Sequence, residues 1–187
     1  MEKFALLLLL IVPVLVASQD MKNNSEELVY SEVIQVENTT KAQLYNRAKM
    51  WFATTYNDSK EVLQVENKEN GQLVGNAVFN YEPNVFRGNK QTEGVIKYTI
   101  KLFLKEGRYK YIVGPFYHEP HDNGYGIFTC GKLTTAQEHP NPKALAKGWS
   151  DKVWKDVTTQ TDNNVNALVN SFKKRMKKPI ESGGDNW

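Results

Sequence analysis

Cysteine and histidine are scarce in this chain of 187 residues, which contains one cysteine, Cys130, and three histidines. A single cysteine cannot form an internal disulfide, so the fold must be stabilised by its hydrophobic core. An excess of one charge is also lacking, and the net charge of +3 is too small to indicate a polyanionic partner by itself. No glycine-rich phosphate loop is present, since Gly124, Gly126 and Gly131 do not lead from a strand into a helix.

Long hydrophobic runs are absent except at the start of the chain. The apolar residues 4–16 follow Lys3 and are followed by small residues. This is the pattern of a secretory signal peptide, which we expect at residues 1–18 with cleavage after Ser18. A membrane-spanning helix needs about 20 apolar residues, and this run is shorter and contains Pro13, so no transmembrane span is expected after cleavage. The sequence therefore predicts an exported protein, which passes the inner membrane and is periplasmic or secreted.

Removal of 18 residues from 187 leaves a mature chain of 169 residues. A chain of this size buries about 70% of its unfolded surface as one domain, so a second domain is not needed for stability. We expect a single domain at residues 28–178. A flexible polar leader is expected before it, at residues 19–27, and a disordered tail after it, at residues 179–187.

The domain is expected to begin with a strand and a helix. Residues 28–37 are rich in Val, Ile and Tyr and predict a strand, although the pattern does not decide which face points inward. Thr40 and Gln43 then have the spacing of a capping box, in which the hydroxyl meets an unpaired N–H and the amide reaches back. The helix that follows is predicted to run for about four turns, with a wide apolar face that includes Leu44, Ala48, Trp51 and Thr55.

Alternating apolar and polar residues predict four consecutive strands at residues 61–66, 72–81, 94–105 and 108–116. The last two strands form the clearest hairpin, since a two-residue turn joins Lys105 to Arg108. This register predicts an apolar face made by the pairs Leu104–Tyr109, Leu102–Tyr111 and Ile100–Val113. The opposite face is basic and carries Lys97, Lys101, Lys105, Arg108 and Lys110, with Thr99, Phe103 and Ile112 between them.

Residues 117–148 are dominated by His, Pro, Gly, Asp and Asn, and they predict an irregular connection with room for one irregular strand. From Trp149 the chain is expected to be helical, with Ser150 or Asp151 as its cap. The apolar stripe of this helix consists of Val153, Val157, Thr161, Val165, Leu168, Phe172 and Met176. Its basic end suits the negative C-terminal pole of a helix.

These elements predict an α+β fold with an antiparallel sheet of about five strands, in the order β-α-β-β-β-β-α, and with both helices on one face of the sheet. The sequence resembles an exported family seen mainly in Bacteroidetes, the domain of unknown function number 4468, above all in LYNRAKMWF and KEGRYKY. The resemblance covers residues 28–118 and 149–177, and it implies a TATA-binding-protein-like fold and export to a Gram-negative envelope. It implies no catalytic residues. A fold does not specify a function, so no nucleic-acid partner is expected from the name of the fold.

Ligand-type side chains gather in the expected connection, namely His118, Glu119, His121, Asp122, Cys130 and His139. One hypothesis is a metal-dependent or thiol enzyme that uses the three histidines and Cys130. The alternative is a polar loop, because Pro120 breaks the helical turn on which His118 and His121 would align. Cys130 itself is either a small buried hydrophobe or a reactive thiol. We therefore assign no catalytic, metal-binding or cofactor-binding residue and expect no cofactor.

Two surfaces could bind a partner without catalysis. The basic face around Phe103 could hold an acidic polymer, a lipid phosphate or a protein, or it could be only the solvated face of a sheet. A pocket between the sheet and the C-terminal helix would be lined by Tyr98, Tyr109, Tyr111 and Phe172, unless these rings form the core. We expect a non-catalytic envelope or periplasmic binding module with an unknown envelope ligand or protein as its partner.

Overall fold

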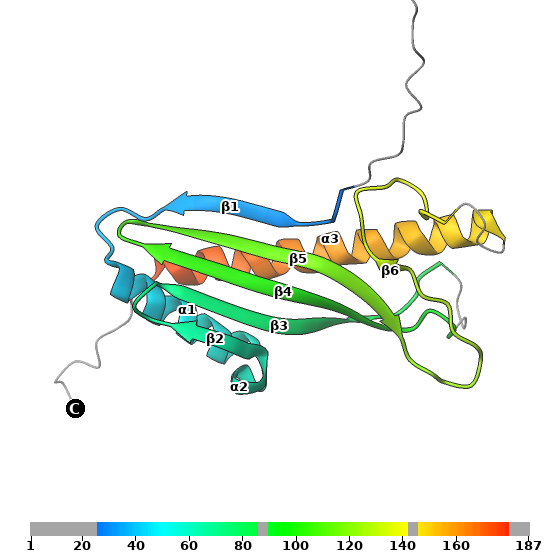
Figure 1. Ribbon diagram of the computed structural model, residues 1–187, viewed down its shortest axis with the longest axis horizontal. Helices are drawn as coiled ribbons and strands as arrows, with labels where there is room; N and C mark the ends of the chain where they lie inside the picture. The colour runs from blue at the N-terminus through cyan, green and yellow to red at the C-terminus, as the bar shows by residue number, and fades with distance from the viewer. Residues whose placement is uncertain (1–25, 86–89, 142–145, 180–187) are drawn as a thin grey trace, which may run out of the picture.

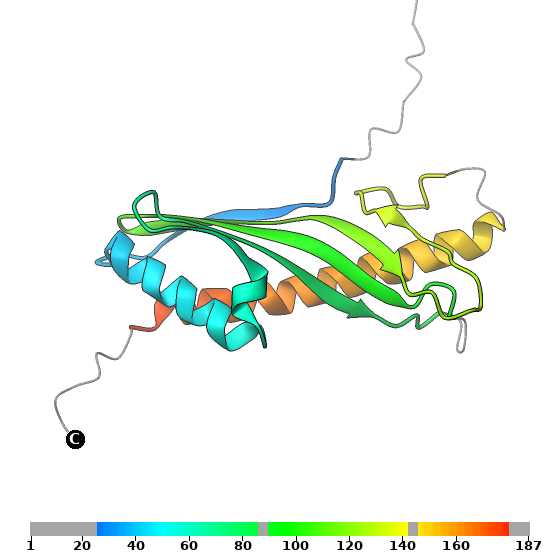
Figure 2. The same ribbon diagram turned by 60° about the horizontal axis from the view of Figure 1, so that its bottom comes forward.

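A computed structural model describes residues 26–85, 90–141 and 146–179 of the chain. Within these residues, an antiparallel sheet of six strands is covered on one face by two helices, α1 (Lys41–Thr55) and α3 (Lys147–Lys177) (Figure 1, Figure 2). The predicted α+β class is confirmed, with one strand more than the five expected. The signal peptide expected at residues 1–18, most of the expected leader at 19–27 and the expected tail from residue 180 lie outside the described residues.

The order of the strands in the sheet differs from their order in the chain. It is β1 (Tyr30–Gln35), β5 (Arg108–Pro120), β4 (Gly94–Lys105), β3 (Gln72–Tyr81) and β2 (Leu63–Asn67). The two-residue strand β6 (Gly131–Lys132) pairs with β5 beyond the end of β1. Strands β4 and β5 are therefore central strands, each paired on both sides.

The hairpin of β4 and β5 has the predicted register. Leu104 lies opposite Tyr109, and the next inward pairs are Leu102–Tyr111 and Ile100–Val113. All six side chains are buried. Gly107 in the turn has a φ of 67°, a left-handed conformation that favours glycine. The two-residue turn thus fixes which face of the hairpin enters the core.

Helix α1 begins with the predicted capping box. The Thr40 hydroxyl accepts the Gln43 backbone N–H at 3.2 Å, and the Gln43 side-chain oxygen accepts the Thr40 N–H at 2.9 Å. Two further bonds join α1 to the end of α3: the buried Arg47 donates to the Met176 carbonyl at 2.7 Å, and the Trp51 indole donates to the Ser171 hydroxyl at 2.9 Å.

Helix α3 lies along the inner face of the sheet, and the seven residues of its predicted stripe are all buried. Its start is different from the prediction, because it begins at Lys147 after Ala146 and neither Ser150 nor Asp151 caps it. The Asp151 carboxylate is instead bonded to the Lys147 ammonium at 2.8 Å and to the His139 backbone N–H at 3.1 Å. None of the helices in the described part of the chain is both long and apolar enough to cross a membrane.

The strand predicted at residues 61–66 begins later than expected. Residues 59–62 form a single helical turn, α2 (Ser59–Val62), and β2 starts at Leu63. The cause is Asp58, whose carboxylate accepts the backbone N–H groups of Lys60 at 3.0 Å and Glu61 at 3.1 Å. This cap stabilises a helical turn at residues that alternate like a strand.

Strand β5 continues to Pro120, four residues beyond its predicted end, so residues 117–120 do not belong to the expected irregular connection. His118 pairs with Ile96, and Pro120 at the end of the strand pairs with Gly94. The backbones approach so closely there that a Cβ atom on Gly94 would lie 2.2 Å from the Glu119 carbonyl oxygen. The remaining connection contains β6, and its residues 142–145 lie outside the described residues.

Candidate functional site

His118 lies on the inner side of β5 and is 3% exposed. Its Nε2 donates to the Thr92 carbonyl at 2.8 Å, and its Nδ1 accepts the Cys130 backbone N–H at 3.0 Å. The two partners assign the tautomer that carries its proton on Nε2. Burial lowers the pKa of this histidine, so the ring is neutral and both nitrogens are engaged. His118 is thereby a structural link between the sheet and the connection after it, with no free nitrogen for a metal ion.

Cys130 is buried close to that ring. Burial raises the pKa of its thiol to about 12, which keeps it protonated at neutral pH. Nucleophilic attack requires the thiolate, so the structure agrees with an inert small hydrophobe and not with a reactive thiol.

The other two histidines, His121 and His139, make contacts with other residues than His118 and Cys130. His121 is exposed, and its backbone N–H donates to the Glu93 carbonyl at 2.8 Å. The ring of His139 packs against Phe128 and Trp154, with ring centroids 5.6 Å apart in both pairs. Across the described ranges, no three His, Cys, Asp or Glu side chains form a group that could hold a metal ion. The structure therefore does not assemble the hypothetical cluster.

The pocket considered between the sheet and α3 is occupied by the core itself. Tyr98, Tyr109, Tyr111 and Phe172 are all buried, at 1–6% exposed. The Phe172 ring lies edge-on to Tyr109 at 5.3 Å and to Tyr111 at 6.4 Å. These aromatic residues stabilise the domain by packing, which leaves the opposite face of the sheet as the candidate surface.

Helices α1 and α3 cover one face of the sheet, which leaves the other as its outer face (Figure 1, Figure 2). The predicted basic residues lie on this outer face. Along β4, exposed lysines at 97, 101 and 105 alternate with buried apolar residues, so all three point away from the core. Arg108 and Lys110 are exposed on the same side of β5.

The charges on this face are neutralised at one end only. Lys97 forms an ion pair with Glu119, and both side chains are more than half exposed. Four cations near the turn are different: in the described part of the chain, no carboxylate forms an ion pair with Lys101, Lys105, Arg108 or Lys110. We call these four residues the hairpin cations. The carboxylate in the turn, Glu106, is bonded elsewhere, because it accepts the Lys41 backbone N–H at 3.0 Å.

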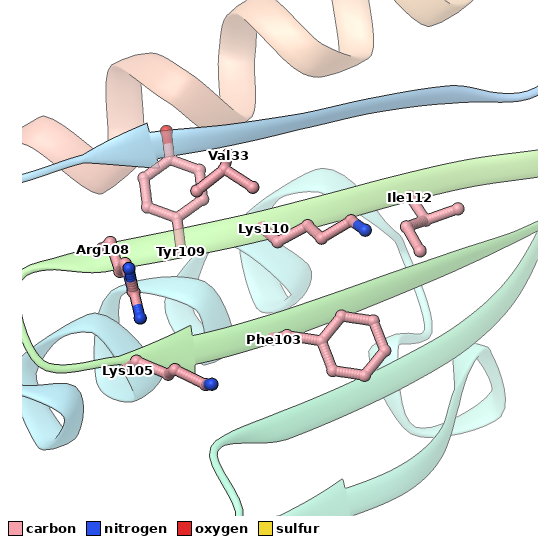
Figure 3. A pocket seen from close by; sticks show the side chains of 7 residues that line it. All are labelled: Val33, Phe103, Lys105, Arg108, Tyr109, Lys110 and Ile112. Atoms are coloured by element: carbon pink, nitrogen blue, oxygen red, sulfur yellow. The ribbon is translucent and has the colours of Figure 1, made fainter.

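A hollow of about 450 Å³ is lined by three of these cations, Lys105, Arg108 and Lys110 (Figure 3). Its lining residues are Val33, Phe103, Lys105, Arg108, Tyr109, Lys110 and Ile112. Three strands supply its apolar side chains, with Val33 from β1, Phe103 from β4 and Ile112 from β5. Figure 3 shows Lys105 and Arg108 at the turn end of this hairpin hollow, and Phe103 and Ile112 further along the strands. Sequence reasoning missed Val33, which is 55% exposed, because the first strand gave no clear inward face.

A second hollow, of about 330 Å³, lies further along the same face. The residues that line this distal hollow are Asn76, Ala77, Val78, Lys97, Tyr98, Thr99, Pro115 and Tyr117. Its cation is Lys97, which Glu119 neutralises. The outer face thus offers a charged hollow near the turn and a more neutral one away from it.

Residues 30–119 match the family model described as "Domain of unknown function (DUF4468) with TBP-like fold". A TBP-like protein from Parabacteroides distasonis ATCC 8503 is similar in structure, with a TM-score of 0.53 and 18% identity over 79% of this chain and 93% of that chain. A DUF4468 family protein from Bacteroides ovatus ATCC 8483 has a TM-score of 0.50 and 13% identity, over 78% of this chain and 86% of that chain. No curated protein matches the chain in sequence. The predicted family is confirmed for residues 30–119, and the predicted fold is confirmed. At 18% and 13% identity, the solved structures are evidence for the fold alone.

Proposed function

We propose that this protein, whose residues 30–119 belong to the DUF4468 family with its TBP-like fold, is a non-catalytic binding module that works through the outer face of its sheet. The observation that carries this proposal is an apolar hollow lined by Lys105, Arg108 and Lys110, three of the four hairpin cations, with which no described carboxylate forms an ion pair. His118 and Cys130 favour a module without catalysis, since their polar groups are engaged or buried.

The position of the hairpin cations supports binding over a merely solvated face. Lysines often protect the edge strands of a sheet from pairing with other chains. Here β4 and β5 are central strands, so the cations on them have no edge to protect. Like charges held on one hairpin also repel each other, and the free energy of unfolding would rise if carboxylates were placed between them. An anionic partner would remove that repulsion.

The exposed apolar side chains of the same face support the proposal independently. Val33 is 55% exposed and Val78 is 51% exposed, each beside one of the two hollows. Apolar side chains exposed among polar residues on one face are typical of an interaction site. The inner face is already filled by the two helices, so the outer face is the side of the sheet open to a partner.

Export is also part of the proposal. The signal-peptide pattern at residues 1–18 supports it, and an envelope component would then be the partner. Fractionation of the native cells and N-terminal sequencing test this point. We expect a mature chain that starts at Gln19 in the periplasmic or secreted fraction, whereas an uncleaved chain in the cytoplasmic fraction would contradict it.

A charge reversal tests the binding surface. Lys101→Glu together with Lys110→Glu should abolish the thermal stabilisation that anionic ligands from a panel of glycans, lipids and peptides give to the wild type. The matched control is Lys152→Glu with Lys155→Glu, which makes the same charge change at exposed positions of α3. Surface substitutions usually change stability by within about 0.5 kcal/mol, so both variants should fold. Ligands that stabilise both variants equally, or a panel without any ligand, would refute the proposal.

A further inference from the structure

The outer face of the sheet is polarised from end to end. The hairpin cations lie near the turn of β4 and β5, while Lys97, eight residues earlier on β4, is neutralised by Glu119. At about 3.3 Å per residue, Lys105 lies about 26 Å from Lys97 along β4, and Lys101 lies between them, about 13 Å from each. The cations without an ion-pair partner thus cover the half of the strand nearer the turn, and a polymer with charge along its whole length would find no such cation in the other half.

Apolar side chains continue where the free charge stops. Ile112 lines the hairpin hollow, and Pro115 and Tyr117, further along β5, line the distal hollow. Tyr117 is 43% exposed, and across the sheet Val78 and Tyr117 flank Lys97 in register. The face therefore presents a cationic end followed by an apolar track along β5.

From this polarity we infer that the ligand is an amphiphilic anion, a single apolar chain with a carboxylate or phosphate at one end. The inference rests on the proposed function and specifies the ligand of the same surface. Arg108 and the neighbouring Lys105 and Lys110 would bind the acidic group, since a guanidinium matches the geometry of carboxylate and phosphate. The chain would lie over Phe103 and Ile112 and extend toward Tyr117. The volume of the hairpin hollow, about 450 Å³, falls within the range of about 300–1,000 Å³ that small-molecule sites occupy.

The length of the chain gives a quantitative test. Octanoate, decanoate and dodecanoate are titrated into the whole protein by calorimetry, each below the concentration at which it forms micelles. Each CH₂ group buried contributes about 0.8 kcal/mol, so the dissociation constant should fall up to about fourfold per added CH₂. Dodecyl phosphate should bind like dodecanoate, while dodecyltrimethylammonium and inorganic phosphate should bind at least tenfold more weakly. Equal affinity for the three carboxylates would overturn the inference.

Two variants separate the roles of head and tail. Lys105→Gln with Lys110→Gln should weaken dodecanoate binding at least tenfold, and the control Lys152→Gln with Lys155→Gln, which removes the same charge from α3, should not. Phe103→Ser should flatten the dependence on chain length while the preference for anions over the ammonium compound remains. If circular dichroism shows that Phe103→Ser is unfolded, Tyr117→Ser, which is 43% exposed at the far end of the track, replaces it.

Heparin, a polyanion without an apolar tail, separates failure of this inference from failure of the proposed function. If heparin binds in a way that needs Lys105 and Lys110, and dodecanoate does not bind, the amphiphile is wrong and the binding surface stands. If dodecanoate binds equally to the charge variant and to its control, its binding is nonspecific and the inference is wrong. If neither probe binds and the panel of anions also gives no ligand, both proposals fail.

Discussion

Replacement of His118 by leucine tests whether this residue is structural, as its two hydrogen bonds indicate. Leucine fills a similar space but cannot bond, so the Thr92 carbonyl and the Cys130 amide would both lose their partner in the interior. A buried polar group without a partner costs about 1–3 kcal/mol, which gives a loss of about 2–6 kcal/mol for the pair. Domains of this kind have a free energy of unfolding of about 5–15 kcal/mol, so the loss should be large enough to measure.

The assay is urea unfolding followed by circular dichroism and tryptophan fluorescence. With a slope of about 2 kcal/mol/M, a loss of about 4 kcal/mol lowers the unfolding midpoint by about 2 M. His121→Leu is the matched control, since that side chain is exposed and its substitution should change the free energy by within about 0.5 kcal/mol. The reasoning is refuted if His118→Leu costs no more than His121→Leu.

Three more predictions concern the same framework. Burial lowers the pKa of His118 and of His139 below the ordinary 6.5. On acidification the unfolded chain therefore binds protons before the folded chain does. The contribution of these two residues to the free energy of unfolding is complete above about pH 6.5, and it should be lost as the pH falls through the folded pKa values. A urea midpoint that rises between about pH 7 and pH 5 would contradict this. The Cys130 thiol, with its pKa raised to about 12, should react with a thiol reagent only after unfolding, and fast labelling of the native protein would show the assignment to be wrong. Thr40→Ala should cost about 1 kcal/mol through the lost cap of α1, a value that the same urea titration measures; no change would mean that the capping box does not stabilise the helix.

The parts of the fold that could be predicted are those fixed by short-range chemistry. A two-residue turn sets the register of the hairpin, and therefore the positions of Leu104 and Tyr109 follow from the sequence. A hydroxyl and an amide three residues apart identify the start of α1. The basic outer face follows from the same alternation, which is why its residues could be named in advance.

The parts that could not be predicted depend on contacts between distant segments. Pro120 and the polar residues around it resemble a loop, yet pairing with β4 keeps them in β5. The burial of His118 had one local signal, since Phe116 and His118 are inward and Tyr117 and Glu119 outward, as in a regular strand. Earlier in the strand, Val113 and Gly114 are both buried although they are adjacent. The alternation therefore changes phase at this point, and the burial of His118 does not follow from the pattern of the residues before it. The hairpin hollow could not be predicted either, because Val33 lies at it only through the pairing of β1 with β5, two strands that are far apart in the sequence.

The two faces of β4 differ in what a substitution there would change. Ile96, Ile100 and Leu104 hold the domain together, so exchanges at these positions are limited by volume and by packing. The outward-facing positions of the same strand, such as Lys97, Lys101 and Lys105, are exposed, so they can take new side chains at little cost to folding. Variation of the hairpin cations could therefore redirect the domain from one ligand to another while its architecture stays the same. The inner face, which determines the fold, and the outer face, which carries the hairpin cations, can therefore change independently of each other.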